Sequence, residues 1–135
     1  MDKTNGMENE IPKNTPKVLV VDDDRNIFEV LRNFLRREGC DVVWASTPEV
    51  ALGRIHENDI DLLISDIRPE HQSGRGLLAQ LKSIKSDLPV ILITGYPEAI
   101  SEKDVKALGA DHFFQKPLDL LQMRRAVRSC LHLSM

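Results

Sequence analysis

Short apolar runs alternate along this chain with segments that have helical periodicity. Each run is only a few residues long and rich in Val, Ile and Leu, which is typical of parallel strands buried on both faces. The pattern predicts strands over residues 17–22, 41–45, 61–66, 89–94 and 111–115.

Amphipathic helices are predicted between these strands. In residues 25–38, apolar side chains recur at the spacing of one helical face and predict a core-facing stripe: Ile27, Val30, Leu31, Phe34 and Leu35. Gly39 suits the end of this helix. The second helix is expected to begin at Ser46-Thr47-Pro48-Glu49, which combines a capping hydroxyl with a proline in the first turn.

Three further helices are expected over residues 76–84, 101–108 and 118–131, the first of them after a loop over residues 67–73. The helix over residues 101–108 has the weakest apolar pattern of the five. The expected inward-facing residues of the middle helices are Ala51, Leu52 and Ile55; Leu77, Leu78 and Leu81; and Val105, Ala107 and Leu108.

This order predicts a doubly wound α/β fold, a (βα)₅ three-layer sandwich around a five-stranded parallel sheet, because right-handed crossovers place helices on both faces. The length of 135 residues suits one domain, expected over residues 17–135. Residues 1–16 are rich in Asn, Lys, Glu and Pro and are predicted to be a disordered tail.

Composition narrows the classes of function. The net charge of −3 and the pI near 5.8 argue against nucleic-acid binding by this segment. No apolar run approaches the roughly 18 residues that span a bilayer, and the first residues lack the apolar core of a signal peptide. Cys40 and Cys130 lack metal or redox spacing and are interpreted as unpaired thiols in a reducing cytosol. We therefore expect a cytoplasmic protein.

Chemically active residues follow four of the predicted strands. Asp22 and Asp23 end the first, Asp66 ends the third, Thr94 ends the fourth, and Lys116 follows the fifth. The carboxyl ends of parallel strands open into one crevice, where ligands bind. Carboxylates, a hydroxyl and an ammonium gathered there suit Mg²⁺ and a phosphoryl group.

Each residue taken alone also has a simpler interpretation. The acidic pair could favour the dipole of the following helix, and Asp24, nearest to that helix, is predicted to be its cap. Asp66 could initiate a turn, Thr94 could simply close a strand, and Lys116 could be a surface lysine. The conjunction of all of them favours the metal and phosphoryl site.

With these motifs, residues 16–133 resemble the receiver domain of bacterial two-component response regulators, the CheY-like superfamily with a flavodoxin-like fold. The resemblance implies that Asp66 is the phosphoacceptor and that Asp22, Asp23, Asp66 and the backbone carbonyl of Arg68 hold Mg²⁺. It also implies that Thr94 is the switch hydroxyl and Lys116 the invariant lysine.

Further roles follow from the same resemblance. Phe113 takes the position of the aromatic switch residue, and the Lys116–Pro117 bond is expected to be cis. Arg68 and Tyr96 occupy the positions that tune dephosphorylation, and their bulk predicts a long-lived phosphoryl state. The chain departs from the family pattern at Pro69 and Glu70, where the loop proline has moved by one place.

The implied partners are a sensor histidine kinase or a phosphotransfer protein, with no direct contact to nucleic acid or membrane. A homodimer would use the helix over 101–108, the strand over 111–115 and the helix over 118–131. The domain would be a signalling module rather than an enzyme, with only self-catalysed phosphotransfer and slow dephosphorylation.

Two alternatives stay open. A degenerate receiver would bind proteins without taking phosphate, and Pro69-Glu70 is its only support. A phosphohydrolase of the haloacid-dehalogenase type would use Asp22 as nucleophile in an Asp22-x-Asp24 motif, although Arg25-Asn26 fit that motif poorly and the chain lacks a cap domain.

Two other features are assigned structural roles. Trp44 is expected to provide core or edge packing. Arg124, Arg125 and Arg128 are expected to favour the dipole at the end of their helix, with ion pairs at a dimer face as a second reading.

Overall fold

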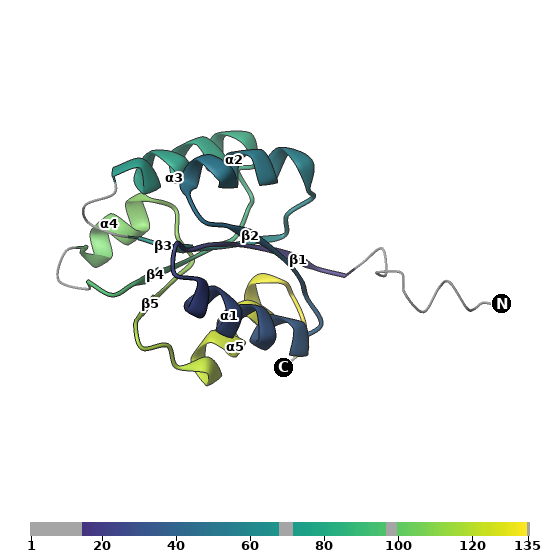
Figure 1. The fold of residues 1–135 in the computed structure, drawn as a ribbon. Helices are drawn as coiled ribbons and strands as arrows, with labels where there is room; N and C mark the ends of the chain where they lie inside the picture. Colours follow the sequence, from purple (N-terminus) through teal and green to yellow (C-terminus); the bar gives the residue numbers. More distant parts are fainter. Residues whose placement is uncertain (1–14, 68–71, 97–99, 135) are drawn as a thin grey trace.

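A five-stranded parallel sheet forms the centre of the computed structural model, which describes residues 15–67, 72–96 and 100–134 (Figure 1). The strand order is β2-β1-β3-β4-β5. The elements in chain order are β1 (Lys17–Val21), α1 (Arg25–Arg37), β2 (Asp41–Ala45), α2 (Pro48–Glu57), β3 (Leu62–Asp66), α3 (Gln72–Ile84), β4 (Val90–Thr94), α4 (Glu102–Ala107), β5 (His112–Gln115) and α5 (Leu120–Cys130).

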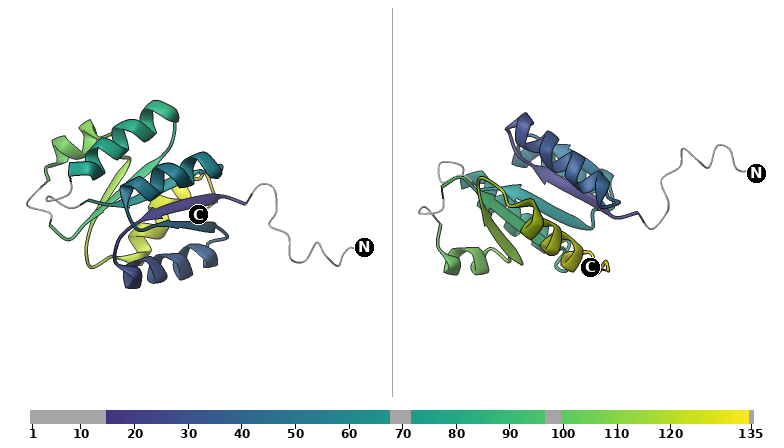
Figure 2. Two further views of the ribbon diagram at one scale, coloured as in Figure 1. Left: turned by 45° about the horizontal axis from the view of Figure 1, so that its top comes forward. Right: turned by 90° about the horizontal axis from the view of Figure 1, so that it is seen from below.

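Helices cover both faces of the sheet, so the predicted doubly wound fold is confirmed. Helices α2, α3 and α4 lie on one face and α1 and α5 on the other (Figures 1 and 2). Alternate residues of each strand supply the two cores, as β1 illustrates: Leu19 and Val21 pack toward α2 and α3, whereas Val18 and Val20 pack toward α1 and α5. Because both faces are buried, the strands are apolar almost throughout.

Helix α1 turns a slightly different face to the core than the sequence predicts. Val30 is 49% exposed, so its assignment to the core is wrong, and Phe28 is buried in its place. Leu31 and Leu35 complete the buried stripe as expected. Phe28 stacks on Trp44 of β2, with ring centroids 5.0 Å apart, so its burial is shared with the edge strand.

Helices α3 and α4 also differ in detail from the prediction. Helix α3 begins at Gln72 rather than near residue 76, so the preceding loop is shorter than expected. Ala107, predicted to face inward, is exposed: among the described side chains, the short α4 buries Val105, and its C-cap Leu108 is partly buried. A capping box between Ser101 and Asp104 starts this helix.

Some predictions fall on parts that the structure does not describe. Residues 1–14, most of the expected tail, lie outside the described residues, as does the side chain of Leu77. The carbonyl of Pro16 accepts a hydrogen bond from the Asp41 backbone N–H at 2.8 Å, beside the start of β1.

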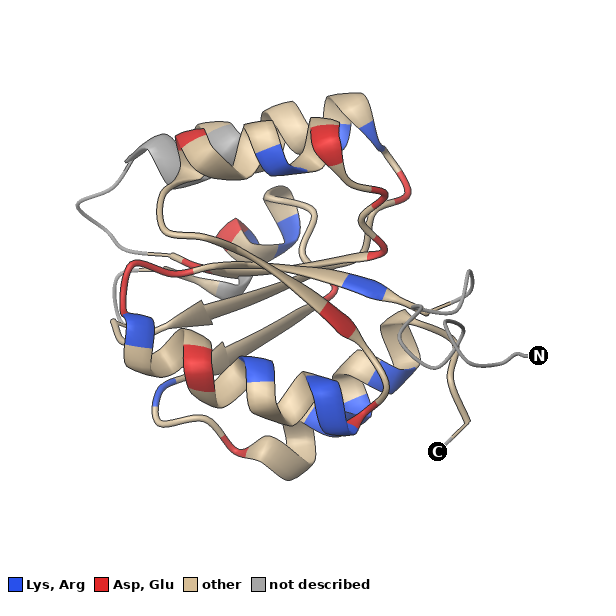
Figure 3. Cartoon of the chain, turned by 45° about the vertical axis from the view of Figure 1, so that its right-hand side comes forward, with Lys and Arg blue, Asp and Glu red and all other residues tan. Residues whose placement is uncertain are grey.

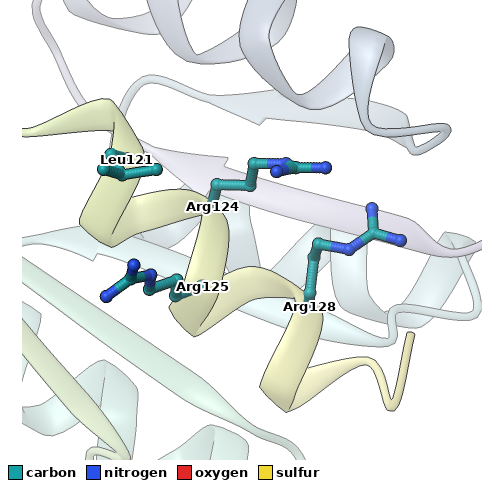
Figure 4. A pocket seen from close by; sticks show the side chains of 4 residues that line it. All are labelled: Leu121, Arg124, Arg125 and Arg128. Carbon is teal, nitrogen blue, oxygen red and sulfur yellow. The ribbon is translucent and has the colours of Figure 1, made fainter. Parts of the chain in front are cut away.

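Glu38, which caps the end of α1, ties this helix to α5. Its Oε1 lies 3.1 Å from Arg124 Nε and 2.9 Å from Arg128 Nη1. Arg124 and Arg128 project from one side of α5 and Arg125 points away from them (Figure 4). Two of the three arginines therefore hold two helices together, a role that the sequence did not indicate.

The charge of Glu38 depends on these two arginines. Burial by itself raises the pKa of Glu38, but hydrogen bonds from Arg128 and Arg124 outweigh it and hold the pKa below its ordinary value of 4.5. The ionised carboxylate therefore stabilises the fold above pH 4.5, and this contribution is lost as the pH falls through the lowered pKa.

We expect Glu38→Gln to lower the free energy of unfolding by about 1 kcal/mol at pH 7, because charge-assisted hydrogen bonds to partners that keep some contact with water, Arg124 more than Arg128, contribute modestly. Urea unfolding at several pH values measures this difference, which should shrink as the pH falls through the lowered pKa of Glu38.

Glu57→Gln is the matched control. Its ion pair with Arg54 is 3.7 Å long and both side chains are largely exposed, so the variant should unfold like the parent. Equal stability losses in the two variants would contradict a special role for Glu38.

Candidate functional site

The carboxyl ends of four strands place the predicted site residues side by side. β1 pairs with β3, β3 with β4, and β4 with β5, all in parallel. Asp66 and Thr94 end their strands, Asp22 follows β1 directly, and Lys116 follows β5 directly. The site thus forms where the strand order reverses between β1 and β3.

Three carboxylates meet at this edge. Asp22, Asp23 and Asp66 each offer an oxygen, and these oxygens lie within 4.8 Å of one another. Asp22 and the side chain of Asp66 are almost fully buried, whereas Asp23 is exposed. Figure 3 shows the acidic turn that leads from β1 into α1.

Asp22 is held in place through several of its polar groups. Its backbone N–H donates to Ala45 O at 3.1 Å, and its Oδ1 accepts from the Asp24 backbone N–H at 2.8 Å. Burial is the main cause that raises the pKa of Asp22 above its ordinary value of 3.8. The Asp24 hydrogen bond lowers this pKa, the neighbouring Asp66 charge raises it, and Lys116 lowers it.

Lys116 lies between two of the carboxylates. Its Nζ is 3.4 Å from Asp22 Oδ2 and 3.4 Å from Asp66 Oδ2. Its backbone N–H donates to Thr94 O at 2.8 Å, and its bond to Pro117 is cis, as the resemblance implies. One ammonium cannot balance three carboxylates, and three hard oxygen donors this close suit a divalent cation such as Mg²⁺.

Thr94 and Phe113 lie on the same face of the sheet. Phe113 pairs in register with Leu92, both pack into the core under α2, α3 and α4, and Thr94 stands two residues beyond Leu92. Thr94 is buried, and its Oγ1 accepts a hydrogen bond from the Tyr96 backbone N–H at 2.9 Å. The hydroxyl hydrogen of Thr94 can therefore donate toward the crevice.

The remaining predicted residues lie at the margin of the site or outside the described residues. Tyr96 is 46% exposed. Arg68, with its predicted carbonyl ligand, belongs to residues 68–71, which the structure does not describe, as do Pro69 and Glu70. Their roles in metal binding and dephosphorylation stay predictions.

The three acidic residues after β1 have different structural roles. Asp24 is the cap of α1, as predicted, because its side chain accepts from the backbone N–H groups of Asn26 and Ile27. Asp22 therefore points into the site instead of capping the helix.

Sequence reasoning missed one contributor, Trp44, whose indole Nε1 donates to the Asp22 backbone carbonyl at 2.9 Å. A single tryptophan on an edge strand carries no signal of such a bond.

The cysteines lie away from this site. Both are free thiols, and burial raises the pKa of Cys40 and of Cys130 to about 11, with smaller contributions from nearby charges. They are therefore protonated at neutral pH and poor nucleophiles.

Among the described residues, no helix has the length and apolar character to cross a bilayer.

Comparisons with a family model and with individual relatives point to the same family. The family described as response regulator receiver domain matches residues 18–128. The alkaline phosphatase synthesis transcriptional regulatory protein PhoP of Bacillus subtilis is 31% identical over 118 residues, which are 87% of this chain and 49% of PhoP. The transcriptional regulatory protein ZraR of Escherichia coli is 29% identical over 114 residues, 84% of this chain and 26% of ZraR. The chain thus spans half or less of these relatives.

Solved structures share the fold. A response regulator receiver domain protein from Clostridium thermocellum has a TM-score of 0.78 at 27% identity, with 87% of this chain and 94% of that chain covered. The response regulator protein TrrA from Thermotoga maritima, in complex with Mg²⁺–BeF, has a TM-score of 0.76 at 30% identity, with coverage of 86% and 99%.

We expect Asp22→Asn to stabilise the metal-free protein at pH 7 by roughly 1 kcal/mol, because it removes one of three crowded carboxylates. The same variant should lose the stabilisation by Mg²⁺, which in the parent amounts to about 1.4 kcal/mol at ten times the dissociation constant. Thermal unfolding in EDTA and in a Mg²⁺ series measures both effects.

Asp24→Asn is the matched control, because asparagine caps a helix as well as aspartate does. It should respond to Mg²⁺ like the parent. An undiminished Mg²⁺ response in Asp22→Asn would place the metal elsewhere.

Proposed function

Because the chain belongs to the response regulator receiver domain family of two-component signalling, we propose that Asp66 accepts a phosphoryl group from a sensor histidine kinase or a phosphotransfer protein. The observation that carries this proposal is the position of Asp66 in the crevice. Its carboxylate lies beside Asp22 and Asp23 and 3.4 Å from the Lys116 ammonium. A nucleophile, acidic metal ligands and a cation for the phosphoryl oxygens are therefore in one place.

In the proposed reaction an oxygen of Asp66 attacks the phosphorus of a phosphohistidine. The new P–O bond forms in line with the breaking P–N bond, and the imidazole leaves as neutral histidine after taking up a proton. Asp22, Asp23 and Asp66, with the Arg68 carbonyl, would hold Mg²⁺, which when bound offsets the charge of the phosphoryl oxygens.

Lys116 and Thr94 then act on the product. The ammonium of Lys116 already bridges Asp22 and Asp66, and it can keep Asp22 while turning toward a phosphoryl oxygen. The Thr94 hydroxyl can donate to the same group. Both residues would hold the acyl phosphate rather than form covalent bonds with it.

The proposed switch couples Thr94 to Phe113. Movement of the Thr94 side chain toward the phosphoryl group would vacate space on the face that it shares with Phe113, and Phe113 would turn inward to fill it. This rearrangement would change the surface formed by α4, β5 and α5. Helix α4 is the shortest of the described helices and buries little, which suits a segment that shifts at small cost.

Partners and output are further parts of the proposal. The changed α4-β5-α5 surface would serve a homodimer or a downstream protein. PhoP and ZraR are transcriptional regulators of which this chain spans only a part, so a connected output is a proposal as well. The acidic receiver itself would work in the cytoplasm without contacting nucleic acid or membrane.

We expect one phosphoryl group to be added to the protein during incubation with acetyl phosphate and Mg²⁺, because Asp66 is poised to attack phosphorus. Intact-mass spectrometry measures the adduct, which should be absent in EDTA and absent in Asp66→Asn.

An adduct that persists in Asp66→Asn would assign the nucleophile to another residue. No adduct, together with binding of beryllofluoride in the crevice, would indicate very fast hydrolysis. If no adduct forms and beryllofluoride does not bind either, the result would favour the degenerate receiver.

We expect the phosphorylated protein to decay slowly, over minutes or longer, because the bulk of Tyr96 shields the acyl phosphate from water. After removal of the donor, mass spectrometry measures the decay. Tyr96→Ala should decay several-fold faster, and Tyr96→Phe, which keeps the bulk, should match the parent. A parent half-life of seconds would refute the shielding role.

A further inference from the structure

Trp44 connects the edge strand β2 to the acidic turn. It pairs in register with Val20 of β1 and packs partly buried against the core under α1 and α5. Its ring stacks on Phe28 at 5.0 Å, and the Arg25 guanidinium lies over it at 5.9 Å from the ring centroid. The indole is therefore fixed between β2 and the first turns of α1.

The last two residues of β2 form hydrogen bonds with both the backbone N–H and the backbone carbonyl of Asp22. The Asp22 backbone N–H donates to Ala45 O at 3.1 Å, and the Asp22 carbonyl accepts from Trp44 Nε1 at 2.9 Å. This carbonyl belongs to the peptide unit that joins Asp22 to Asp23. Because a peptide unit is planar, fixing its carbonyl also fixes the direction in which the chain enters Asp23.

We propose that Trp44 is a positioning residue for the metal ligands: its indole N–H holds the Asp22–Asp23 peptide so that both carboxylates face Asp66. The inference rests on the proposed function, since it concerns the same Mg²⁺ site. It assigns a role in this site to a residue that touches neither metal nor phosphoryl group.

The physical reason is the mutual repulsion of the carboxylates. Lys116 offsets only part of their charge, so without a metal ion Asp22, Asp23 and Asp66 would lower their energy by moving apart, and rotation of the Asp22–Asp23 peptide is one way for them to do so. A donor that opposes this rotation keeps the ligands gathered in the metal-free protein. Mg²⁺ then binds to a prepared site instead of expending binding energy on assembling it.

Phenylalanine at position 44 tests this role, because it can keep the stack on Phe28 but has no N–H to donate. We expect Trp44→Phe to bind Mg²⁺ about tenfold more weakly than the parent, as is common when a group that orients a metal ligand is lost. Isothermal titration calorimetry on the whole chain, well below the unfolding temperature, measures the dissociation constant.

Leu35→Val is the matched control for packing alone. Leu35 is fully buried in the same core, at the far end of α1, so this variant should lose stability yet keep the Mg²⁺ affinity of the parent. If Trp44 serves only packing, Trp44→Phe will behave like Leu35→Val, and the inference is overturned.

A second readout uses the chain's single tryptophan, which gives one indole N–H resonance in ¹H–¹⁵N spectra. Mg²⁺ should shift this resonance in the parent and leave it unchanged in Asp22→Asn. A resonance that stays in place while calorimetry detects binding would overturn the positioning role. A parent that binds no Mg²⁺ would instead refute the proposed function and, with it, the role of Trp44.

Discussion

Repulsion among three carboxylates is the constraint on which the rest of the site depends. Asp22, Asp23 and Asp66 approach within 4.8 Å at one end of a sheet whose strands are buried on both faces. Such a cluster persists only where the backbone is rigid and a cation is near. The apolar strands provide the rigidity, and Lys116, 3.4 Å from two of the carboxylates, provides part of the compensating charge.

The segment after β1 shows how neighbouring residues of one chemical type take different roles. Asp24 caps α1, Asp22 turns into the crevice, and Asp23 stands exposed beside it. Ala45 and Trp44 of β2 form hydrogen bonds with the backbone of Asp22. The acidic turn therefore depends on an edge strand that supplies no ligand itself. The edge of the sheet thus contributes to the geometry at its centre.

The helices differ in how firmly they are attached to the sheet. On one face, Glu38 joins α1 to α5 through two arginines, and the aromatic pair of Phe28 and Trp44 joins α1 to β2. On the other face, α4 is short and buries Val105 and part of Leu108. The proposed movement of Thr94 and Phe113 lies on the face that carries α4, and a change in the packing of so short a helix costs little.

The sequence alone was enough to predict the parallel sheet, the strand ends and the residues on them, because buried strands must be apolar and their polar ends then stand out. The family followed from the same residues. Only the tertiary structure decided that Phe28 rather than Val30 faces the core, that Glu38 binds Arg124 and Arg128, and that Trp44 holds Asp22. These contacts join residues far apart in the chain or choose between adjacent helical faces, and local periodicity carries no information about either.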